Sequence, residues 1–189
     1  NDSNDHYTFV DFDKDLLLWV RMDDINNTDG VTDLSSYSTN GTNVSGAFQN
    51  SSGQFGSAFQ FDGTNDYINM GNQPRFFTSG NFSVSLWFKT FDNTTNNYMA
   101  ADYISTGKSS FALRLNTAGK TNFFWENPGG TFPMATSTTL IKKNRWYHVV
   151  AVWNGTTRLL YLDGILEGTN PTSQVRDDSG DITSIGKPG

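Results

Sequence analysis

The sequence contains no cysteine and only two histidines. The absence of cysteine excludes disulfide bonds and thiol catalysis, and with so few histidines a zinc site is not expected either. His6 lies in a polar segment, and His148 alternates with apolar residues, which is typical of a packed histidine rather than of a general base. The Gly-x-Ser-x-Gly motif and the glycine-rich phosphate loop are also missing. These absences argue against enzymes that use a nucleophilic side chain or a nucleotide.

Glutamate is as scarce as histidine, with two residues against seventeen aspartates. Glycoside hydrolysis needs two carboxyl groups that converge on the scissile bond. Glu126 and Glu167 lie forty-one positions apart, and neither is followed by an acidic residue two positions later. The sequence therefore favours a protein that is not an enzyme. A catalytic pair formed by two aspartates that the fold brings together stays an open alternative.

Neither a basic patch nor a long apolar run is present. The formal net charge is −6, whereas nucleic-acid-binding surfaces concentrate Lys and Arg. The one basic cluster, at positions 142, 143 and 145, is typical of a solvated turn. No stretch approaches the about 18 apolar residues of a membrane span, and no signal peptide is evident. We expect no nucleic-acid partner, no direct membrane insertion, and a chain processed or excised from a longer protein.

The pattern of apolar residues and turns predicts an all-β protein. Residues 145–168 hold three apolar runs separated by Asn154-Gly155 and Asp163-Gly164, and both dipeptides favour the tight turns of antiparallel hairpins. Alternate positions of residues 82–88 are apolar, which indicates a strand with one buried face. Residues 16–22 form a continuous apolar run, the pattern of a strand buried on both faces. No segment shows a helical period.

Three segments resemble, in the family's order, blocks of laminin G-like domains of the concanavalin A-like lectin/glucanase superfamily. They are residues 53–68 (GQFGSAFQFDGTNDYI), 82–88 (FSVSLWF) and 145–168 (RWYHVVAVWNGTTRLLYLDGILEG). The resemblance implies a two-sheet antiparallel β-sandwich of the jelly-roll, concanavalin A-like type over residues 16–189. Residues 1–15 are then a linker or a strand that leads into this domain.

The end of the chain departs from the family pattern. Family members close with a further inner strand after a glycine turn, whereas residues 181–189 reach such a turn and stop. The resemblance therefore implies that the last strand is missing, which leaves a slot beside residues 145–152 and 158–162 or their sheet neighbours. Unpaired backbone groups in a slot are costly. Either the chain was excised from a longer protein, or another strand fills the slot, for example residues 8–12 of the same or a neighbouring chain.

The function implied by this resemblance is that of a non-catalytic recognition module, which binds a glycan or a surface protein as part of a larger extracellular or cell-surface protein. One alternative is a subunit or decoration of a surface filament or layer that assembles by strand exchange. A second alternative is a degenerate glycoside hydrolase or lyase domain. Sugar recognition uses aromatic faces that stack on the ring and polar groups that hold hydroxyls. The candidates for these roles are Tyr98, Tyr103, Arg114, Trp125 and Phe132.

Calcium is the one metal that the composition favours, because it is bound by carboxylate and carbonyl oxygens on loops. The candidate ligands are Asp23, Asp62 and Asp66, with Asp24 and Asp33 as further candidates. In some members of the family an aspartate at the rim precedes the aromatic residue that Phe111 resembles, and this chain has Ser110 there. The bound calcium would be structural.

Asn-x-Ser/Thr sequons begin at eight positions, about twice the roughly four that chance would give for this composition. Such sequons accept N-linked glycans in secreted proteins, which favours an extracellular or cell-surface setting. One sequon begins at Asn1, and the candidate glycosylation sites are Asn26, Asn40, Asn43, Asn50, Asn81, Asn93 and Asn154.

Overall fold

The computed structural model describes residues 15–73, 76, 80–105, 108–127, 130–171 and 182–189, without the side chains of residues 103–105, 108 and 109. The prediction for residues 8–12 lies outside the described residues. The described residues form thirteen strands: β1 (Thr42–Val44), β2 (Phe48–Asn50), β3 (Ala58–Gln60), β4 (Tyr67–Asn69), β5 (Phe82–Lys89), β6 (Asn97–Ser105), β7 (Lys108–Leu115), β8 (Thr121–Phe124), β9 (Met134–Thr136), β10 (Trp146–Trp153), β11 (Arg158–Leu162), β12 (Ile165–Asn170) and β13 (Thr183–Ile185).

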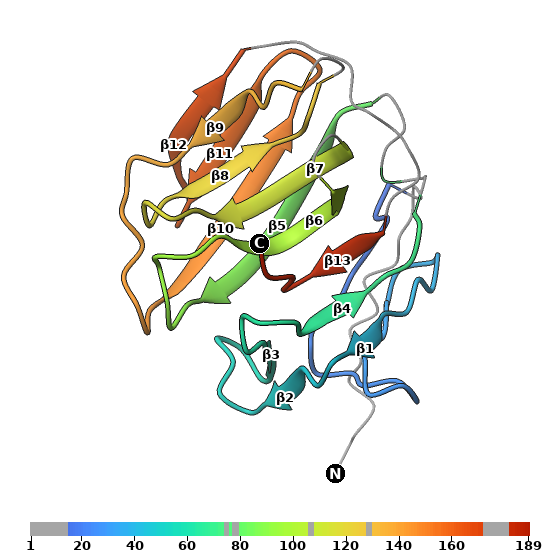
Figure 1. Cartoon of the computed structure of the whole chain (residues 1–189). Helices are drawn as coiled ribbons and strands as arrows, with labels where there is room; N and C mark the ends of the chain where they lie inside the picture. Colours follow the sequence, from blue (N-terminus) through green and yellow to red (C-terminus); the bar gives the residue numbers. More distant parts are fainter. Residues whose placement is uncertain (1–14, 74–75, 77–79, 106–107, 128–129, 172–181) are drawn as a thin grey trace.

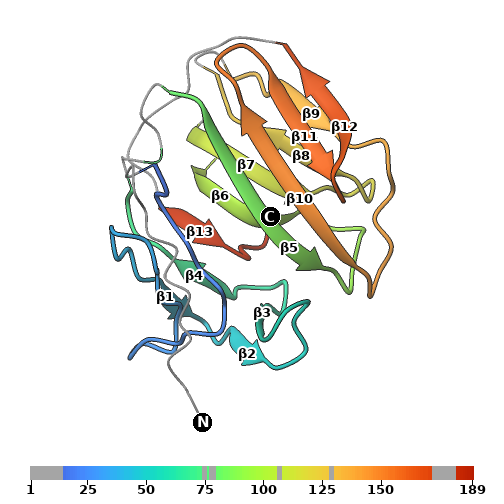
Figure 2. The same cartoon turned by 180° about the vertical axis from the view of Figure 1, so that it is seen from behind.

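The strands form two facing sheets (Figures 1 and 2). One sheet has the order β1-β4-β13-β6-β7-β8-β9 and the other has the order β12-β11-β10-β5, while β2 and β3 form a separate hairpin. Every strand pair is antiparallel. The predicted all-β sandwich is therefore confirmed. The described residues contain no helix that is long and apolar enough to cross a membrane.

The main core lies between the two sheets, because alternate residues of the long strands point inward. In β10 the inward positions are buried and the positions between them are half-buried, as period two requires. The apolar positions predicted for residues 82–88 pack on the same core. The buried members of this core are Phe88, Ala100, Phe111, Leu113, Leu115, Phe123, Trp125, Ala135, Ile141, Tyr147, Val149, Ala151, Trp153, Leu160 and Leu162.

Arg158 is a charged residue inside this core. Its side chain is fully buried, and its guanidinium carbon lies 3.4 Å from the centroid of the Trp125 ring and 5.6 Å from that of Trp153. Burial lowers the pKa of Arg158 to about 10, because removal from water disfavours the cation. The faces of the two indole rings offset part of that cost, since their electron density attracts a cation.

The C-terminal residues complete the larger sheet. β13 pairs with β4 on one side and with β6 on the other, so it is an inner strand that precedes the glycine turn. Gly186 follows it with a φ of 79°, and no further strand follows within residues 182–189, as the sequence predicts. β10 and β11 also have neighbours on both sides, so no slot lies beside them. Among the described residues β5 is paired on one side only, with β10. Assembly through a strand added at β5 stays a prediction, which light scattering of the purified chain would test.

Residues 16–22 are not in a strand, which corrects the prediction of a strand buried on both faces. The side chains of residues 16–20 are half-buried, and the segment joins the loop around Asp33 rather than a sheet. The Trp19 N–H donates to Asp33 Oδ1 at 2.9 Å, and the Leu34 N–H donates to the Trp19 carbonyl at 2.9 Å. Leu18 packs on a second, smaller core built around Val31, Ala47, Ile68 and Met70.

The carboxylate of Asp33 organises this loop. Oδ1 accepts hydrogen bonds from the backbone N–H groups of Trp19 and Ser35, both at 2.9 Å. Oδ2 accepts from the Ser35 hydroxyl at 2.8 Å and from the Thr39 N–H at 2.7 Å. Asp33 is only 4% exposed, so these donors replace the water that the carboxylate loses on folding.

Trp87 and His148 lie on the outward face of the smaller sheet. Their rings stack with centroids 5.0 Å apart, and Phe55 from the loop between β2 and β3 contacts Trp87 edge-on at 5.5 Å. His148 Nε2 lies 2.8 Å from the Ser85 hydroxyl. His148 is therefore packed between neighbours, as its place in the sequence predicts, and Trp87 lies against a loop.

Glu167 joins β12 to the segment that follows β9. One of its carboxylate oxygens accepts from the Thr138 N–H at 2.8 Å and from the Thr139 N–H at 2.9 Å. The Thr139 hydroxyl donates to the other oxygen at 2.8 Å, and the Thr138 hydroxyl donates to the first. These bonds, that of the Thr138 side chain first, lower the pKa of Glu167 to about 2.

The lowered pKa of Glu167 predicts a pH dependence of stability. A carboxyl group with a lowered pKa in the folded state stabilises the fold above its unfolded pKa, and this contribution is lost as the pH falls through the folded value. We therefore expect Glu167→Gln to lower the melting temperature at pH 7, and the difference from the wild type to shrink between about pH 4.5 and pH 2. Thermal melts of both proteins across this range would measure it. A difference that stays constant down to pH 2.5 would contradict the assignment.

Candidate functional site

The outer face of the seven-stranded sheet carries a small group of aromatic residues around an arginine. Leu113 and Leu115 of β7 point into the core, so Arg114 between them points to the opposite face. Tyr98 of β6 is the register partner of Arg114 and shares this face. Phe124 of β8, whose neighbours Phe123 and Trp125 belong to the core, also points outward.

These side chains line a pocket of about 210 Å³, which we term the Arg114 pocket. Its lining residues are Tyr98, Arg114, Phe124, Phe132 and Met134. The guanidinium carbon of Arg114 lies 4.7 Å from the ring centroid of Phe124 and 5.9 Å from that of Tyr98. Phe132, from the loop between β8 and β9, contacts Phe124 edge-on with a centroid distance of 5.9 Å. The pocket therefore combines aromatic walls with one cationic hydrogen-bond donor.

The structure brings together three of the five residues predicted to contact a ligand, namely Tyr98, Arg114 and Phe132. Trp125 is a correction, because it is fully buried in the core between the sheets and does not line the pocket. Tyr103 lies in β6, and its side chain is outside the described residues. Phe124 and Met134 were missed by sequence reasoning. Period two could have indicated Phe124, since it stands between two residues that point the other way.

The predicted calcium ligands lie at two turns, Asp23 at one and Asp62 with Asp66 at the other, and each accepts backbone hydrogen bonds. Asp23 accepts from the Ser57 N–H at 2.7 Å, just before β3, whereas Asp62 follows the end of β3. Asp62 accepts from the N–H groups of Thr64 and Asn65, and the bond from Thr64 is the main cause of its lowered pKa. Asp66 accepts from the Asp62 N–H at 3.1 Å.

No group of three or more His, Cys, Asp or Glu side chains that could hold a metal forms within the described parts of the chain. Asp24 is also engaged, because its carboxylate forms an exposed ion pair with Arg21 at 3.0 Å. Calcium binding by Asp23, Asp62 and Asp66 stays a prediction.

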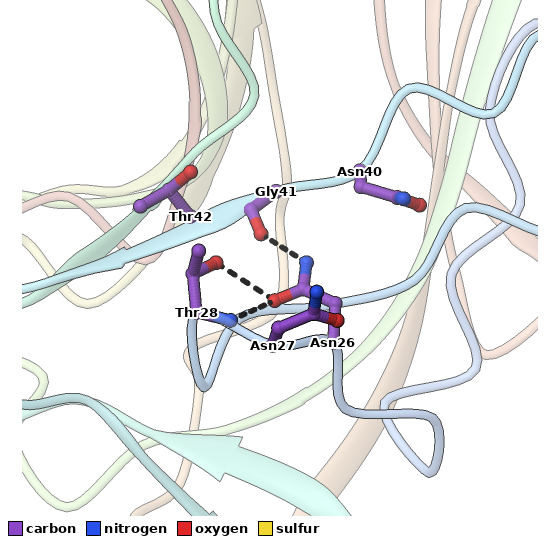
Figure 3. A pocket seen from close by; sticks show the side chains of 6 residues that line it. All are labelled: Asn26, Asn27, Thr28, Asn40, Gly41 and Thr42. Carbon is purple, nitrogen blue, oxygen red and sulfur yellow. Dashed lines mark hydrogen bonds between the residues drawn. The ribbon is translucent and has the colours of Figure 1, made fainter.

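A second pocket, of about 200 Å³, lies between two sequons (Figure 3). Its lining residues are Asn26, Asn27, Thr28, Asn40, Gly41 and Thr42. Asn26 Nδ2 donates to the carbonyls of Val31 at 2.9 Å and Gly41 at 2.6 Å, while its Oδ1 accepts from the N–H and the hydroxyl of Thr28. The Asn26 amide therefore holds the turn against the segment that leads into β1, while Asn40 points away from it in Figure 3.

The other sequon asparagines divide into two groups. Asn43, Asn50 and Asn93 use Nδ2 to donate to the Ala47 carbonyl, the Gln60 side chain and the Ile141 carbonyl, respectively. The exposed residues Asn40, Asn81 and Asn154 make no such bond within the described residues. N-linked glycosylation of any of the seven stays a prediction, and the geometry favours Asn40, Asn81 and Asn154 because Nδ2 is the atom to which the sugar is attached.

The comparisons with known proteins match this architecture. The family model for the concanavalin A-like lectin/glucanases superfamily matches residues 62–188. No curated protein sequence matches the chain.

Three solved structures are similar in fold. The binding domain of Paraclostridial Mosquitocidal Protein 1 has 15% identity and a TM-score of 0.72, over 91% of this chain and 44% of that domain. An S-layer domain-containing protein from Clostridium thermocellum has 23% identity and a TM-score of 0.54, over 84% and 73% of the two chains. The Ruminococcus gnavus sialidase CBM40 bound to α2,3-sialyllactose has 12% identity and a TM-score of 0.50, over 64% and 74%. This chain thus spans less than half of the mosquitocidal binding domain.

Proposed function

We propose that this chain, which belongs to the concanavalin A-like lectin/glucanase superfamily, is a non-catalytic module that binds a glycan in the Arg114 pocket. The observation that carries the proposal is the composition of that pocket. The buried rings of Tyr98 and Phe124 face one guanidinium, and Phe132 adds a third, half-buried aromatic side chain to the same pocket. This is the chemistry by which proteins hold sugars, since ring faces pack on C–H groups and a planar donor binds hydroxyl oxygens.

The size of the pocket limits what it can hold. Pockets for drug-sized ligands typically measure about 300–1,000 Å³, whereas the Arg114 pocket measures about 210 Å³. We therefore propose that one sugar ring occupies the pocket, while the rest of the glycan extends over the sheet. A shallow contact of this kind gives modest affinity for a single site, so several copies of the module would raise the avidity.

The comparisons support a binding role in general. One similar structure is the binding domain of a mosquitocidal protein, and another is a carbohydrate-binding module in complex with sialyllactose. At these identities the likeness concerns the fold, so the glycan partner of this chain remains our proposal. We further propose an extracellular or cell-surface setting within a larger protein. This setting is supported by the likeness to an S-layer domain-containing protein and by the number of sequons.

The proposal predicts that the chain retains particular glycans on an array and that Phe132→Ala weakens their binding about tenfold. The ring of Phe132 forms one wall of the pocket, and loss of a stacked aromatic ring costs about 1.4 kcal/mol, which equals a factor of ten. Calorimetry with the best-retained glycan would measure the change.

Phe91→Ala is the matched control, because Phe91 is 55% exposed and does not line the pocket. It should leave binding unchanged. An array on which no glycan is retained, or a Phe132→Ala variant that binds like the wild type, would refute the proposal. Release of reducing ends from the bound glycan would contradict its non-catalytic part.

A further inference from the structure

We infer that the Arg114 pocket selects a sugar that carries a carboxylate, so that the ligand is an acidic rather than a neutral glycan. The inference rests on the proposed function and names its ligand class. It starts from the Arg114 side chain, which lines the pocket and for which the described residues supply no anion.

Arg114 has no counter-charge within the described residues. The ion pairs there join Arg21 to Asp24, Lys143 to Asp92 and Arg145 to Asp163. Arg114 Nε is buried, and no acceptor for its N–H lies in the same part of the chain. The Arg114 side chain as a whole is only half-buried, so a ligand that brings an anion to the accessible edge of the guanidinium gains affinity.

The neighbours of Arg114 across the sheet do not fill this role. On β8 its register partner is Asn122, whose side-chain oxygen accepts from the Asn116 amide at 2.9 Å. The Asn122 amide nitrogen in turn donates to the Thr136 hydroxyl at 2.8 Å. On β6 the register partner is Tyr98, whose ring faces the guanidinium. Asn122 is therefore engaged with other side chains and Tyr98 offers a neutral ring, so neither neighbour supplies an anion to the arginine.

A carboxylate fits this arrangement better than a hydroxyl does. The rings of Phe124 and Tyr98 hold the guanidinium and attract its charge. A guanidinium presents two parallel N–H groups that match the two oxygens of a carboxylate, and such charge-assisted bonds are about twice as strong as neutral ones. A hydroxyl accepts from one N–H at a time and carries no charge. The pocket should therefore discriminate between two sugars that differ only in a carboxylate.

Glucuronic acid and glucose form such a pair, because they differ only in the group at C6. We would titrate each into the ¹⁵N-labelled protein at pH 7 and in 0.15 M salt, and follow the Nε–Hε resonance of Arg114 by NMR. Glucuronate should shift this resonance and bind at least about tenfold more tightly than glucose. Arg114→Met should reduce the preference to less than about twofold, and Arg114→Lys should keep part of it because the charge remains.

Lys89→Met is the control for charge. Lys89 lies on the smaller sheet, where its ammonium also faces two aromatic rings, those of Phe91 and Trp146. This variant should keep the full preference for glucuronate. The inference is overturned if glucose and glucuronate bind equally, if the preference survives in Arg114→Met, or if glucuronate leaves the Arg114 resonance unshifted. None of these results decides the proposed function, which is tested separately by the glycan array and by Phe132→Ala.

Discussion

Replacing Arg158 by alanine should lower the free energy of unfolding by about 4 kcal/mol, the range found when a large buried side chain is truncated. Arg158 is fully buried, and its guanidinium lies on the ring of Trp125. Truncation leaves a cavity between the sheets, and Trp125 and Trp153 lose a contact on one side. Urea unfolding followed by tryptophan fluorescence would measure the change, because both indoles lie at the site.

A second substitution separates packing from charge. Arg158→Met keeps most of the length of the side chain but removes the cation, whose burial is unfavourable, as the lowered pKa shows. Buried charges replaced by apolar groups of similar volume often cost little stability. We therefore expect Arg158→Met to cost less than half as much as Arg158→Ala. Equal losses in the two variants would show that the charge, and not the packing, stabilises this part of the core.

Replacing Asp33 by alanine should lower the free energy of unfolding by about 3 kcal/mol, because buried donors lose their acceptor. Three backbone N–H groups and one hydroxyl donate to this carboxylate. Without it, the N–H of Trp19 loses the bond that joins residues 16–20 to the loop. Urea unfolding would measure the loss, and hydrogen exchange should increase first at Trp19.

Asp24→Ala is the matched control for Asp33. Asp24 is a nearby aspartate whose side chain is partly exposed and pairs with Arg21. Exposed ion pairs contribute little to stability, so this variant should change the free energy of unfolding by less than about 1 kcal/mol. If Asp33→Ala were no more destabilising than Asp24→Ala, the hydrogen bonds seen around Asp33 would not explain how the loop is held.

The parts of the fold that could be predicted from the sequence depend on neighbours along the chain. The hairpin of β11 and β12 is an example, because the turn at Asp163-Gly164 needs positive φ at both positions, and both have it, at 48° and 82°. The apolar run at residues 16–20 has the composition of a buried strand, but its backbone partners are supplied by Asp33 and Leu34, fourteen or more positions away. Composition alone does not reveal whether residues 16–20 pair with a strand or bond to the loop around Asp33.

The candidate site was predicted only in part, because residue type is a local signal whereas the direction of a side chain depends on strand pairing. Residue type pointed to Tyr98, Arg114 and Phe132, since aromatic rings and arginine suit a sugar. The segment at residues 123–125 is aromatic throughout, so its residue types do not tell which ring points outward. That depends on the pairing of β8 with β7, which places Phe124 opposite Ala112 on the outer face and leaves Trp125 for the core.

The turn held by Asn26 has a consequence for how the chain matures. Both hydrogens of its side-chain nitrogen are used, toward Val31 and Gly41, and a sugar bound to that nitrogen would replace one of them. A glycan on Asn26 would therefore remove one of the two hydrogen bonds that hold the turn against the segment leading into β1. If sugars are added while the chain is growing, modification of Asn26 would compete with closure of this turn.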